Sequence, residues 1–398
     1  MSSDPSRMTA HELRASLGLA GVGGLRMLGM FIILPVFALY AQQLPGGGSH
    51  ALIGFALGAY GLTQALLQFP FGWLSDHWGR KRTLYLGLIL FALGSFVASI
   101  ANDIYLVILG RVVQGSGAVS AAVIALAADL TRDQHRTKAM AIIGMTIGAT
   151  FALSLVAGPI LGRLVGVPGI FALTGVLALG ALAVVRWVVP DPQSAPGRSV
   201  QRVSVVALLR NPELLRLNVG IFVLHAVLMA LFVIVPFALR ESGLAPARHW
   251  QVYLPVMMAS VALMLPVMLA AERQGKQKLA FLGAVGVLLV AQGILAATQD
   301  SLPGLVLGLI AFFAAFNLLE ASLPAMISRA APPGQKGAAV GIFTSLQFLG
   351  AFAGAAAGGA VSQFFGAPAV FALCGLLTLS WLLVAWPMSA PAAVGVLT

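Results

Sequence analysis

The chain is poor in charged residues. Only 9% of its 398 residues are charged, while 59% are hydrophobic. Soluble domains carry roughly 25% charged residues, so a chain of this composition cannot cover a water-facing surface of the required size. The mean hydropathy is +0.96, and about 20 apolar residues suffice to cross a bilayer. The sequence therefore predicts an all-α membrane protein.

Other absences exclude further classes of protein. The single cysteine, Cys374, allows no intramolecular disulfide. The chain has no glycine-rich phosphate loop, so we expect no ATP-driven step and no cofactor. A membrane-embedded enzyme needs a convergent nucleophile–base or metal cluster. We expect neither, nor a bound metal, because the six histidines lie on different segments: His11, His50, His77, His135, His225 and His249.

What the sequence does contain is a series of long apolar windows joined by short connectors. Twelve transmembrane helices are expected at about 17–41, 51–74, 83–101, 104–129, 138–162, 169–190, 216–240, 248–271, 279–298, 303–329, 337–363 and 368–388. The first window is too long for a signal peptide. These windows predict an N-terminal six-helix bundle (1–190), a linker with a short surface helix near 201–210 (191–215), and a C-terminal six-helix bundle (216–390).

The net charge of +11 is unevenly placed. If the N-terminus is cytoplasmic, eighteen of the 23 Lys and Arg residues lie in cytoplasmic segments and three lie on the opposite side. This asymmetry follows the positive-inside rule. We therefore expect a multi-pass membrane protein with both termini cytoplasmic, and no nucleic-acid partner.

The two halves of the chain resemble each other. Residues 76–82 (DHWGRKR) are echoed by residues 272–278 (ERQGKQK), and residues 166–175 (GVPGIFALTG) by residues 366–375 (GAPAVFALCG). The offsets are 196 and 200 residues. Two echoes at nearly one spacing indicate a repeat of two six-helix halves with the same orientation, as in carriers that rock around a midplane site.

The most informative stretch is 72–82, GWLSDHWGRKR, a charged turn between two apolar windows. Its pattern G-x-L-S-D-x-x-G-R-K-R resembles the signature loop of the major facilitator superfamily, between the second and third membrane helices. The resemblance implies the major facilitator fold and a latch at the cytoplasmic gate. The implied latch residues are Gly72, Asp76, Gly79, Arg80 and Asp129.

In that resemblance, Asp76 meets the end of the eleventh helix and Arg80 pairs with Asp129 at the foot of the fourth. His77 stands where a basic residue is usual in the family. The second-half copy, with Gln277, is a weaker match.

Four ionisable residues lie inside apolar windows: Arg26, Arg111, His225 and Glu320. Such residues cost about 2.5–3.5 kcal/mol each on insertion scales and are functional candidates. Arg26, His225 and Glu320 each lie about nine residues, or ~13 Å, from the expected cytoplasmic helix ends. We therefore expect a polar layer across both halves, with Asn218 and Asn317 nearby.

Desolvation favours a neutral carboxyl and a neighbouring arginine favours a charged one. Rocking that alternates these surroundings would make Glu320 a proton carrier, with Arg26 as partner and His225 as relay or substrate contact. The alternative is a static Arg26–Glu320 pair that only holds the bundle together.

Two further motifs resemble those of proton-coupled members of the superfamily. Arg111, with Gln114 and Gly115, resembles the R-x-x-Q-G motif implicated in proton coupling, although a purely structural role is equally open. The Gly158-Pro159-x-x-Gly162 run resembles the fifth-helix packing motif of antiporters. It departs from that motif at Ser154 and Arg163, where glycines are usual. Substrate-cavity candidates are Tyr60, Gln64, Gln68, Gln114 and Asn317.

Across its length the chain resembles the twelve-helix drug:proton antiporters. That implies a monomeric secondary transporter, driven by the proton gradient, that exports amphipathic small molecules by alternating access. A proton-coupled importer of a sugar, nucleoside or amino acid is the alternative on the same fold. One branch of the group carries a soluble domain after its last helix. Only about ten residues follow the twelfth window here, so the chain either belongs to a shorter branch or is a truncated form, and regulation attributed to that domain is not carried over.

Overall fold

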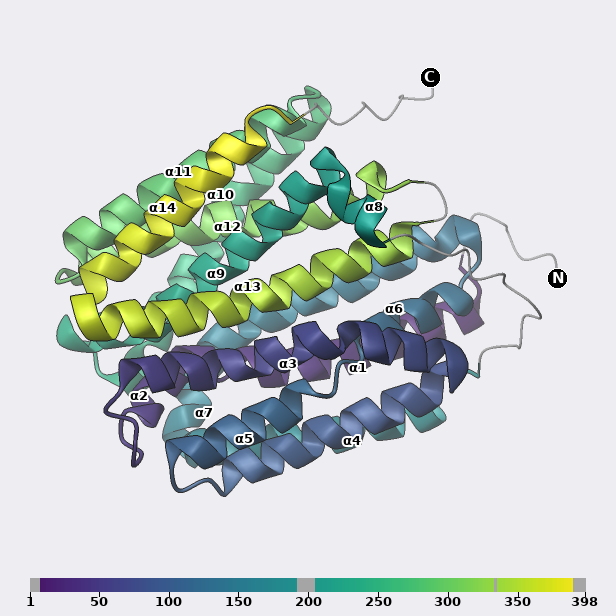
Figure 1. Ribbon diagram of the computed structural model, residues 1–398, viewed down its shortest axis with the longest axis horizontal. Coiled ribbons are helices and arrows are strands. Elements are labelled where there is room, and N and C mark those ends of the chain that lie inside the picture. The colour runs from purple at the N-terminus through teal and green to yellow at the C-terminus, as the bar shows by residue number, and fades with distance from the viewer. Residues whose placement is uncertain (1–7, 192–204, 333–334, 389–398) are drawn as a thin grey trace. The chain divides into compact units, whose positions relative to one another are not determined.

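The computed structural model of the protein describes residues 8–191, 205–332 and 335–388. These ranges are helical and contain no β-strand, as the composition predicts (Figure 1). The first half holds α1 (Ala10–Phe31), α2 (Leu34–Ala41), α3 (His50–His77), α4 (Arg80–Ser99), α5 (Ile104–Gly115), α6 (Ser120–Asp129) and α7 (Arg136–Trp187). The second half holds α8 (Val205–Arg210), α9 (Pro212–Glu241), α10 (Trp250–Arg273), α11 (Gln277–Thr298), α12 (Leu302–Ala330), α13 (Lys336–Phe365) and α14 (Ala367–Ala385).

Eleven helical stretches among the described residues are long and apolar enough to cross a bilayer. One of them, Lys138–Trp187, has 50 residues, about twice the length of a single span. Its backbone leaves the helical conformation at Gly166 (φ 70°, ψ 171°), so it supplies two spans. The prediction of twelve transmembrane helices is therefore confirmed for the described chain.

The spans differ in detail from those expected. The first helix begins at Ala10 because Thr9 and Glu12 form a capping box that satisfies its first backbone N–H groups. The first span is broken between α1 and α2, where Pro35 lies in the first turn of α2 and donates no hydrogen bond. The fourth span is broken between α5 and α6 at the glycine-rich run that includes Gly117. A Cβ atom on Gly117 would lie 2.2 Å from the carbonyl oxygen of Gly87.

The sequence repeat has a matching backbone geometry. Gly166 and Gly366 both adopt positive φ angles, 70° and 80°, each two residues before a proline. Gly79 and Gly275, which correspond through the other echo, adopt φ angles of 107° and 65°. Only glycine adopts such angles at no steric cost. The repeat therefore preserves the same tight turns at the same places in the two halves.

The chain forms two compact units. The first unit comprises Met1–Gly48 and Ala59–Val200, and the second comprises Ser49–Gly58 and Gln201–Thr398. The boundary falls within the expected linker, of which residues 192–204 lie outside the described ranges. The expected surface helix is present as α8. The segment Ser49–Gly58, assigned above to the first half, packs in the second unit, where Gln363 Oε1 accepts hydrogen bonds from the Ser49 hydroxyl and the Ala51 N–H.

Within each unit, neighbouring helices pack along their lengths. In the first unit α7 packs against α1 and α4, and α4 also packs against α5. In the second unit α9 packs against α13, and α11 packs against α12 and α14. Figure 1 shows the α9–α13 pair crossing the second unit.

The α9–α13 contact depends on three glycines spaced four residues apart on α13. Cβ atoms on Gly350, Gly354 and Gly358 would lie 2.2, 1.9 and 2.9 Å from backbone atoms of α9. Small residues at this spacing let two membrane helices approach to backbone contact. The closeness of this pair brings polar side chains of the two helices within hydrogen-bonding distance.

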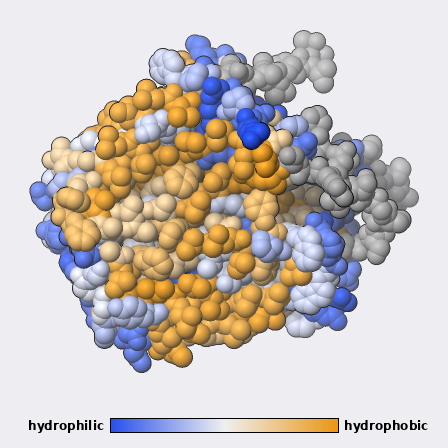
Figure 2. Space-filling view, in the orientation of Figure 1, coloured by the Kyte–Doolittle hydropathy of each residue, from blue (hydrophilic) through white to orange (hydrophobic). Residues whose placement is uncertain are grey.

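The outward faces of the helices are apolar. Figure 2 shows hydrophobic side chains over most of the visible face, with hydrophilic residues gathered towards its ends. In α10 the exposed residues include Met258, Leu263 and Leu265. Such a surface suits acyl chains, and the protein is a multi-pass membrane protein.

The glycine contact gives a testable prediction. Gly354→Val places a side chain where only 1.9 Å separates a Cβ atom from the Ala226 carbonyl oxygen. Overpacking of this kind costs about 1–3 kcal/mol, so we expect a lower midpoint of thermal unfolding in detergent. Gly341→Val on the same helix is the control, because a Cβ atom there meets nothing within 4 Å. Equal midpoints for the two variants would contradict close α9–α13 packing.

Candidate functional site

Three polar side chains meet inside the second unit, one from each of three helices: His225 of α9, Glu320 of α12 and Gln347 of α13. The amide nitrogen of Gln347 lies 2.8 Å from Nε2 of His225 and donates to Oε1 of Glu320 at 3.2 Å. Oε2 of Glu320 lies 3.7 Å from Nε2 of His225. We call these residues the carboxylate–amide–imidazole cluster.

The cluster is only partly buried. His225 is 6% exposed, and the Glu320 side chain is 35% exposed. Nδ1 of His225 lies 3.3 Å from the carbonyl oxygen of Ile221, one turn earlier on α9. A partly exposed glutamate side chain beside a buried imidazole is the arrangement of ionisable groups that marks proton and ion pathways in membrane helices.

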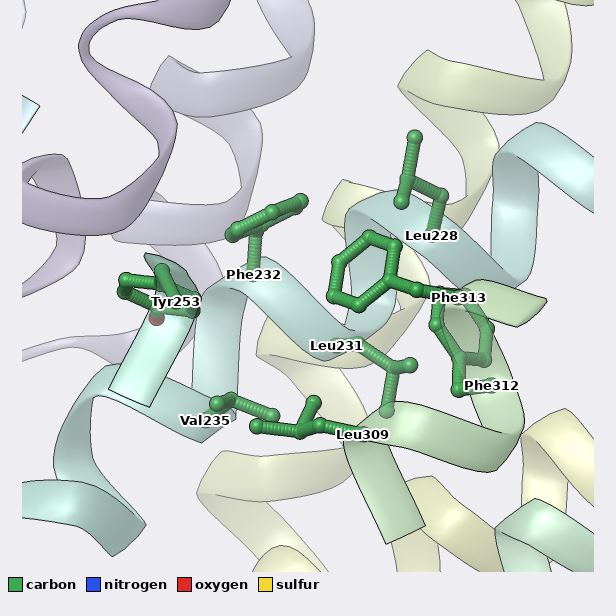
Figure 3. A pocket seen from close by; sticks show the side chains of 8 residues that line it. All are labelled: Leu228, Leu231, Phe232, Val235, Tyr253, Leu309, Phe312 and Phe313. Atoms are coloured by element: carbon green, nitrogen blue, oxygen red, sulfur yellow. The ribbon is translucent and has the colours of Figure 1, made fainter. Parts of the chain in front are cut away.

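Aromatic rings connect the cluster to an apolar pocket. Phe316 packs against the His225 ring, with 5.9 Å between ring centroids, and stacks on Phe312 at the same distance. Figure 3 shows Phe312 and Phe313 at the wall of the pocket, which α9, α10 and α12 enclose. Its lining is Leu228, Leu231, Phe232, Val235, Tyr253, Leu309, Phe312 and Phe313.

A second polar cluster lies in the first unit around Arg26, which is 3% exposed. The Arg26 guanidinium donates to the hydroxyl of Tyr60 at 2.9 Å and to the hydroxyl of Ser120 at 2.5 Å. The amide of Gln64, oriented to satisfy both neighbours, accepts from Arg26 at 2.9 Å and donates to the Gly115 carbonyl at 2.9 Å. Neutral groups hold this buried cation, and no carboxylate among the described residues contacts it.

Arg111 lies beside this cluster and is fully buried. Its guanidinium donates to Oε1 of Gln114 at 2.6 Å, and the Gln114 amide donates to the Ser95 hydroxyl at 2.8 Å. The Arg111 guanidinium also lies 4.8 Å from the centroid of the Tyr60 ring, a cation–π geometry. The R-x-x-Q-G resemblance thus corresponds to a real Arg111–Gln114 contact.

The remaining polar candidates have other surroundings. Asn317 donates to the hydroxyl of Ser260 at 3.1 Å. Gln68 and Asn218 are buried, and each has a side-chain oxygen without a hydrogen-bond partner among the described residues. The structure contains one polar cluster in each unit, with Arg26 and Glu320 each bonded within its own unit, and a single layer across both halves stays a prediction.

The charged turn between α3 and α4 holds a small ion-pair network. Nε of Arg80 lies 2.9 Å from Oδ2 of Asp129 at the end of α6. Arg80 also pairs with Asp76, one turn earlier, and donates to the hydroxyl of Ser75 at 3.1 Å. The structure thus brings Arg80 and Asp129 together, and it gives Asp76 a partner within the turn itself.

Lys81 ties this turn to the end of the first unit. Its ammonium donates to the Val189 carbonyl at 2.7 Å and lies 2.8 Å from Oδ1 of Asp191. The hydrogen bond from Lys81 holds the pKa of Asp191 below its ordinary value. The signature turn is therefore attached to the chain that leads into the linker.

The fifth-helix motif packs where the first span is broken. A Cβ atom on Gly158 would lie 2.4 Å from the Ile32 carbonyl oxygen and 2.8 Å from the ring of Pro35. One on Gly162 would lie 3.3 Å from the Val36 side chain. The first motif glycine therefore permits close approach between α7 and the α1–α2 junction.

Sequence reasoning did not identify Gln347 or Ser120, because a single Gln or Ser in an apolar helix carries no signal of its own. It also omitted the buried Glu12, which binds the Arg132 guanidinium at 2.9 and 3.0 Å and raises the pKa of Arg132. The Thr-x-x-Glu capping pattern at 9–12 could have identified Glu12. No group of three potential metal-ligating residues occurs in the described parts of the chain.

Comparison with known proteins places this geometry in a family. The sequence profile of the Major Facilitator Superfamily matches residues 19–271 and 249–395. The chain is 44% identical over 388 residues to the inner membrane transport protein YajR of Escherichia coli, covering 97% of this chain and 85% of YajR. It is 29% identical over 212 residues, half of each chain, to the quinolone resistance protein NorA of Staphylococcus aureus.

A solved structure has the same fold. The D-xylose–proton symporter is similar with a TM-score of 0.73 and 16% identity, over 96% of this chain and 99% of the symporter. The relatives are membrane transporters and not enzymes, and the chain itself belongs to the major facilitator superfamily of transporters.

Proposed function

We propose that the protein is a proton-coupled secondary transporter that exports amphipathic small molecules in exchange for protons. The observation that carries this proposal is the carboxylate–amide–imidazole cluster. Glu320 is an ionisable group in the interior of a membrane helix, close to a second titratable side chain and only partly buried. An intramembrane carboxylate of this kind marks a proton relay or an ion pathway.

Glu320 is the proton carrier in this proposal. Protonation removes its charge, so the protonated side chain can enter apolar surroundings that would disfavour the carboxylate. Alternating access then exposes the group to one side of the membrane at a time. The Arg26–Glu320 partnership suggested by the sequence joins two units and stays a prediction.

The substrate class follows from the surroundings of the cluster. The rings of Phe312 and Phe316 and the apolar pocket beside them favour hydrophobic or aromatic parts of a molecule. Glu320 supplies a polar end to the same region. An amphipathic compound satisfies both, and the similarity to a quinolone resistance protein supports efflux of such compounds.

Import is the alternative, because the D-xylose–proton symporter shares the fold and a fold does not fix the direction of transport. For the exporter we propose a monomer in the bacterial inner membrane, with both termini cytoplasmic. The proton gradient is its energy source, and no bound cofactor is needed.

The direction of proton movement tests this function. In proteoliposomes with a pH dye inside, an amphipathic compound added outside and carried inward should drive protons out, so the internal pH should rise. Glu320→Gln should abolish this rise because the variant has no carrier group. Glu241→Gln, at the exposed end of α9, should leave it unchanged. A fall in internal pH would identify a symporter, and an unchanged rise in Glu320→Gln would exclude Glu320 as the carrier.

The Arg80–Asp129 pair gives a second test, because a latch should bias the conformational equilibrium. Partly exposed ion pairs contribute up to about 1 kcal/mol, which corresponds to about a fivefold shift between two states. Asp129→Asn should therefore change the transport rate by about that factor, while Asp129→Glu, which keeps the charge, should retain most of it.

Asp300→Asn at an exposed position is the matched control for the loss of a carboxylate. Equal rates for Asp129→Asn and Asp300→Asn, in protein of unchanged expression and gel-filtration profile, would contradict a latch role.

A further inference from the structure

We propose that Gln347 is a positioning residue that directs the transported proton to Glu320 and keeps the neighbouring His225 neutral. This inference rests on the proposed proton coupling, and it concerns which atom of the cluster takes the proton.

The contacts of the His225 imidazole show which of its two ring nitrogens carries the proton. Nδ1 of His225 faces the carbonyl oxygen of Ile221 at 3.3 Å. A carbonyl only accepts hydrogen bonds, so Nδ1 carries the ring proton. In a neutral ring Nε2 is then an acceptor, and it faces the Gln347 amide nitrogen at 2.8 Å.

The Gln347 amide donates to both neighbours. Its nitrogen carries two hydrogens, one for Nε2 of His225 and one for Oε1 of Glu320 at 3.2 Å. Both acceptors are therefore satisfied by one group. If the amide were reversed, its oxygen would face Nε2 of His225 and Oε1 of Glu320. An amide oxygen only accepts hydrogen bonds, so each of those two atoms would then have to carry a proton.

An added proton has two possible places in the cluster, Nε2 of His225 and Oε2 of Glu320. A proton on Nε2 of His225 would face the amide N–H, donor against donor, and would break the 2.8 Å contact. Turning the amide to accept from His225 would then bring its oxygen against the charged Oε1 of Glu320. A proton on Oε2 of Glu320 disturbs neither contact, because this buried oxygen has no hydrogen-bond partner among the described residues. The geometry therefore favours Glu320.

The glycine face of α13 explains how Gln347 reaches both partners. Gln347 lies seven residues before Gly354 and three before Gly350, on the same side of the helix. A Cβ atom on Gly350 would lie 2.2 Å from the carbonyl oxygen of Phe222, in the turn of α9 that precedes His225. Close backbone approach thus brings the amide to the imidazole.

Among the described residues, no other ionisable side chain competes with Glu320 and His225 for the proton. His225 is the only ionisable side chain in contact with Glu320, and Glu320 the only one in contact with His225. The remaining titratable groups of the helices that pack around the cluster are at helix ends or in other contacts. These are Glu213, Arg216, Arg240 and Glu241 of α9, His249, Tyr253, Glu272 and Arg273 at α10, Lys278 of α11, Arg329 of α12, Lys336 of α13, Cys374 of α14, and His50, which contacts Ser362 of α13.

The test locates the proton without requiring transport. Infrared difference spectra of the purified protein, recorded across a pH titration, distinguish a protonated carboxyl from a carboxylate. NMR of labelled histidine distinguishes imidazole from imidazolium. Glu320→Gln and His225→Asn assign the signals by their loss. In the wild-type protein we expect the carboxyl signal of Glu320 to develop while His225 stays neutral. An imidazolium signal from His225 before the carboxyl signal would overturn the proposal.

Gln347→Leu removes both donated hydrogen bonds at similar volume, and we expect the first proton to move to His225, where it faces the Glu320 carboxylate. At the wild-type midpoint the ratio of protonated to ionised Glu320 should fall at least about tenfold, equivalent to a shift of about one pH unit. Gln251→Leu, at an exposed position of α10, should leave both signals unchanged.

If Gln347→Leu does not fold, Gln347→Asn serves instead, because its shorter amide cannot span both partners. An unchanged carboxyl signal in the folded variant would show that burial alone places the proton, and would overturn the proposal. If the proton moves as expected while substrate-driven proton flux is unaffected, the role of Gln347 stands and Glu320 is not the coupling group.

Discussion

Lipid offers no hydrogen bonds, and the arrangement of this protein depends on that constraint. Each polar side chain inside a span must find its partners within the protein. Arg26 does so with the hydroxyls of Tyr60 and Ser120, whereas Glu320 does so through a single amide and a nearby imidazole. The two solutions differ in stability against a change of protonation. A guanidinium is a permanent cation in proteins, whereas a carboxyl group exists either as a carboxylate or as a carboxylic acid.

Close contact between α9 and α13 allows Gln347 to bond both Glu320 and His225. The three glycines of α13 bring its backbone against α9, and a bulkier face would hold Gln347 too far from His225 to bond it. The first unit uses the same device, since a Cβ atom on Gly115 would lie 2.3 Å from the carbonyl oxygen of Tyr60, close to where Gln64 bridges to Arg26. In both units the packing glycines and the polar clusters are therefore parts of one arrangement, and substitutions that fill the glycine faces should disturb the chemistry as well as the fold.

The sequence predicted the architecture well because lipid makes apolar length decisive. The twelve spans follow from window length, and the turns at Gly166 and Gly366 follow from a repeat visible in the letters. The Arg80–Asp129 contact was implied by the resemblance of residues 72–82 to the signature loop of the superfamily, because no local spacing relates two residues 49 positions apart. The composition of the second cluster was only half predictable. His225 and Glu320 are conspicuous as ionisable residues in apolar windows, but Gln347 is not, and its role depends on the rotation of α13 about its own axis. No local pattern fixes that rotation. The sequence also could not show that Ser49–Gly58 packs within the second unit, because that packing depends on contacts with Gln363, far away in the chain.

The unequal charges of the two clusters have an electrical consequence. The first unit contains two buried positive charges, Arg26 and Arg111, and the second contains a carboxylate that protonation can neutralise. A transmembrane voltage acts on a buried charge with about 2.3 kcal/mol per elementary charge per 100 mV across the full field. It therefore pulls the interiors of the two units in opposite directions as long as Glu320 is ionised. Once Glu320 is protonated, the pull on the second unit vanishes while that on the first remains. In the proposed proton-coupled cycle, the membrane voltage would thus favour different conformations before and after proton binding.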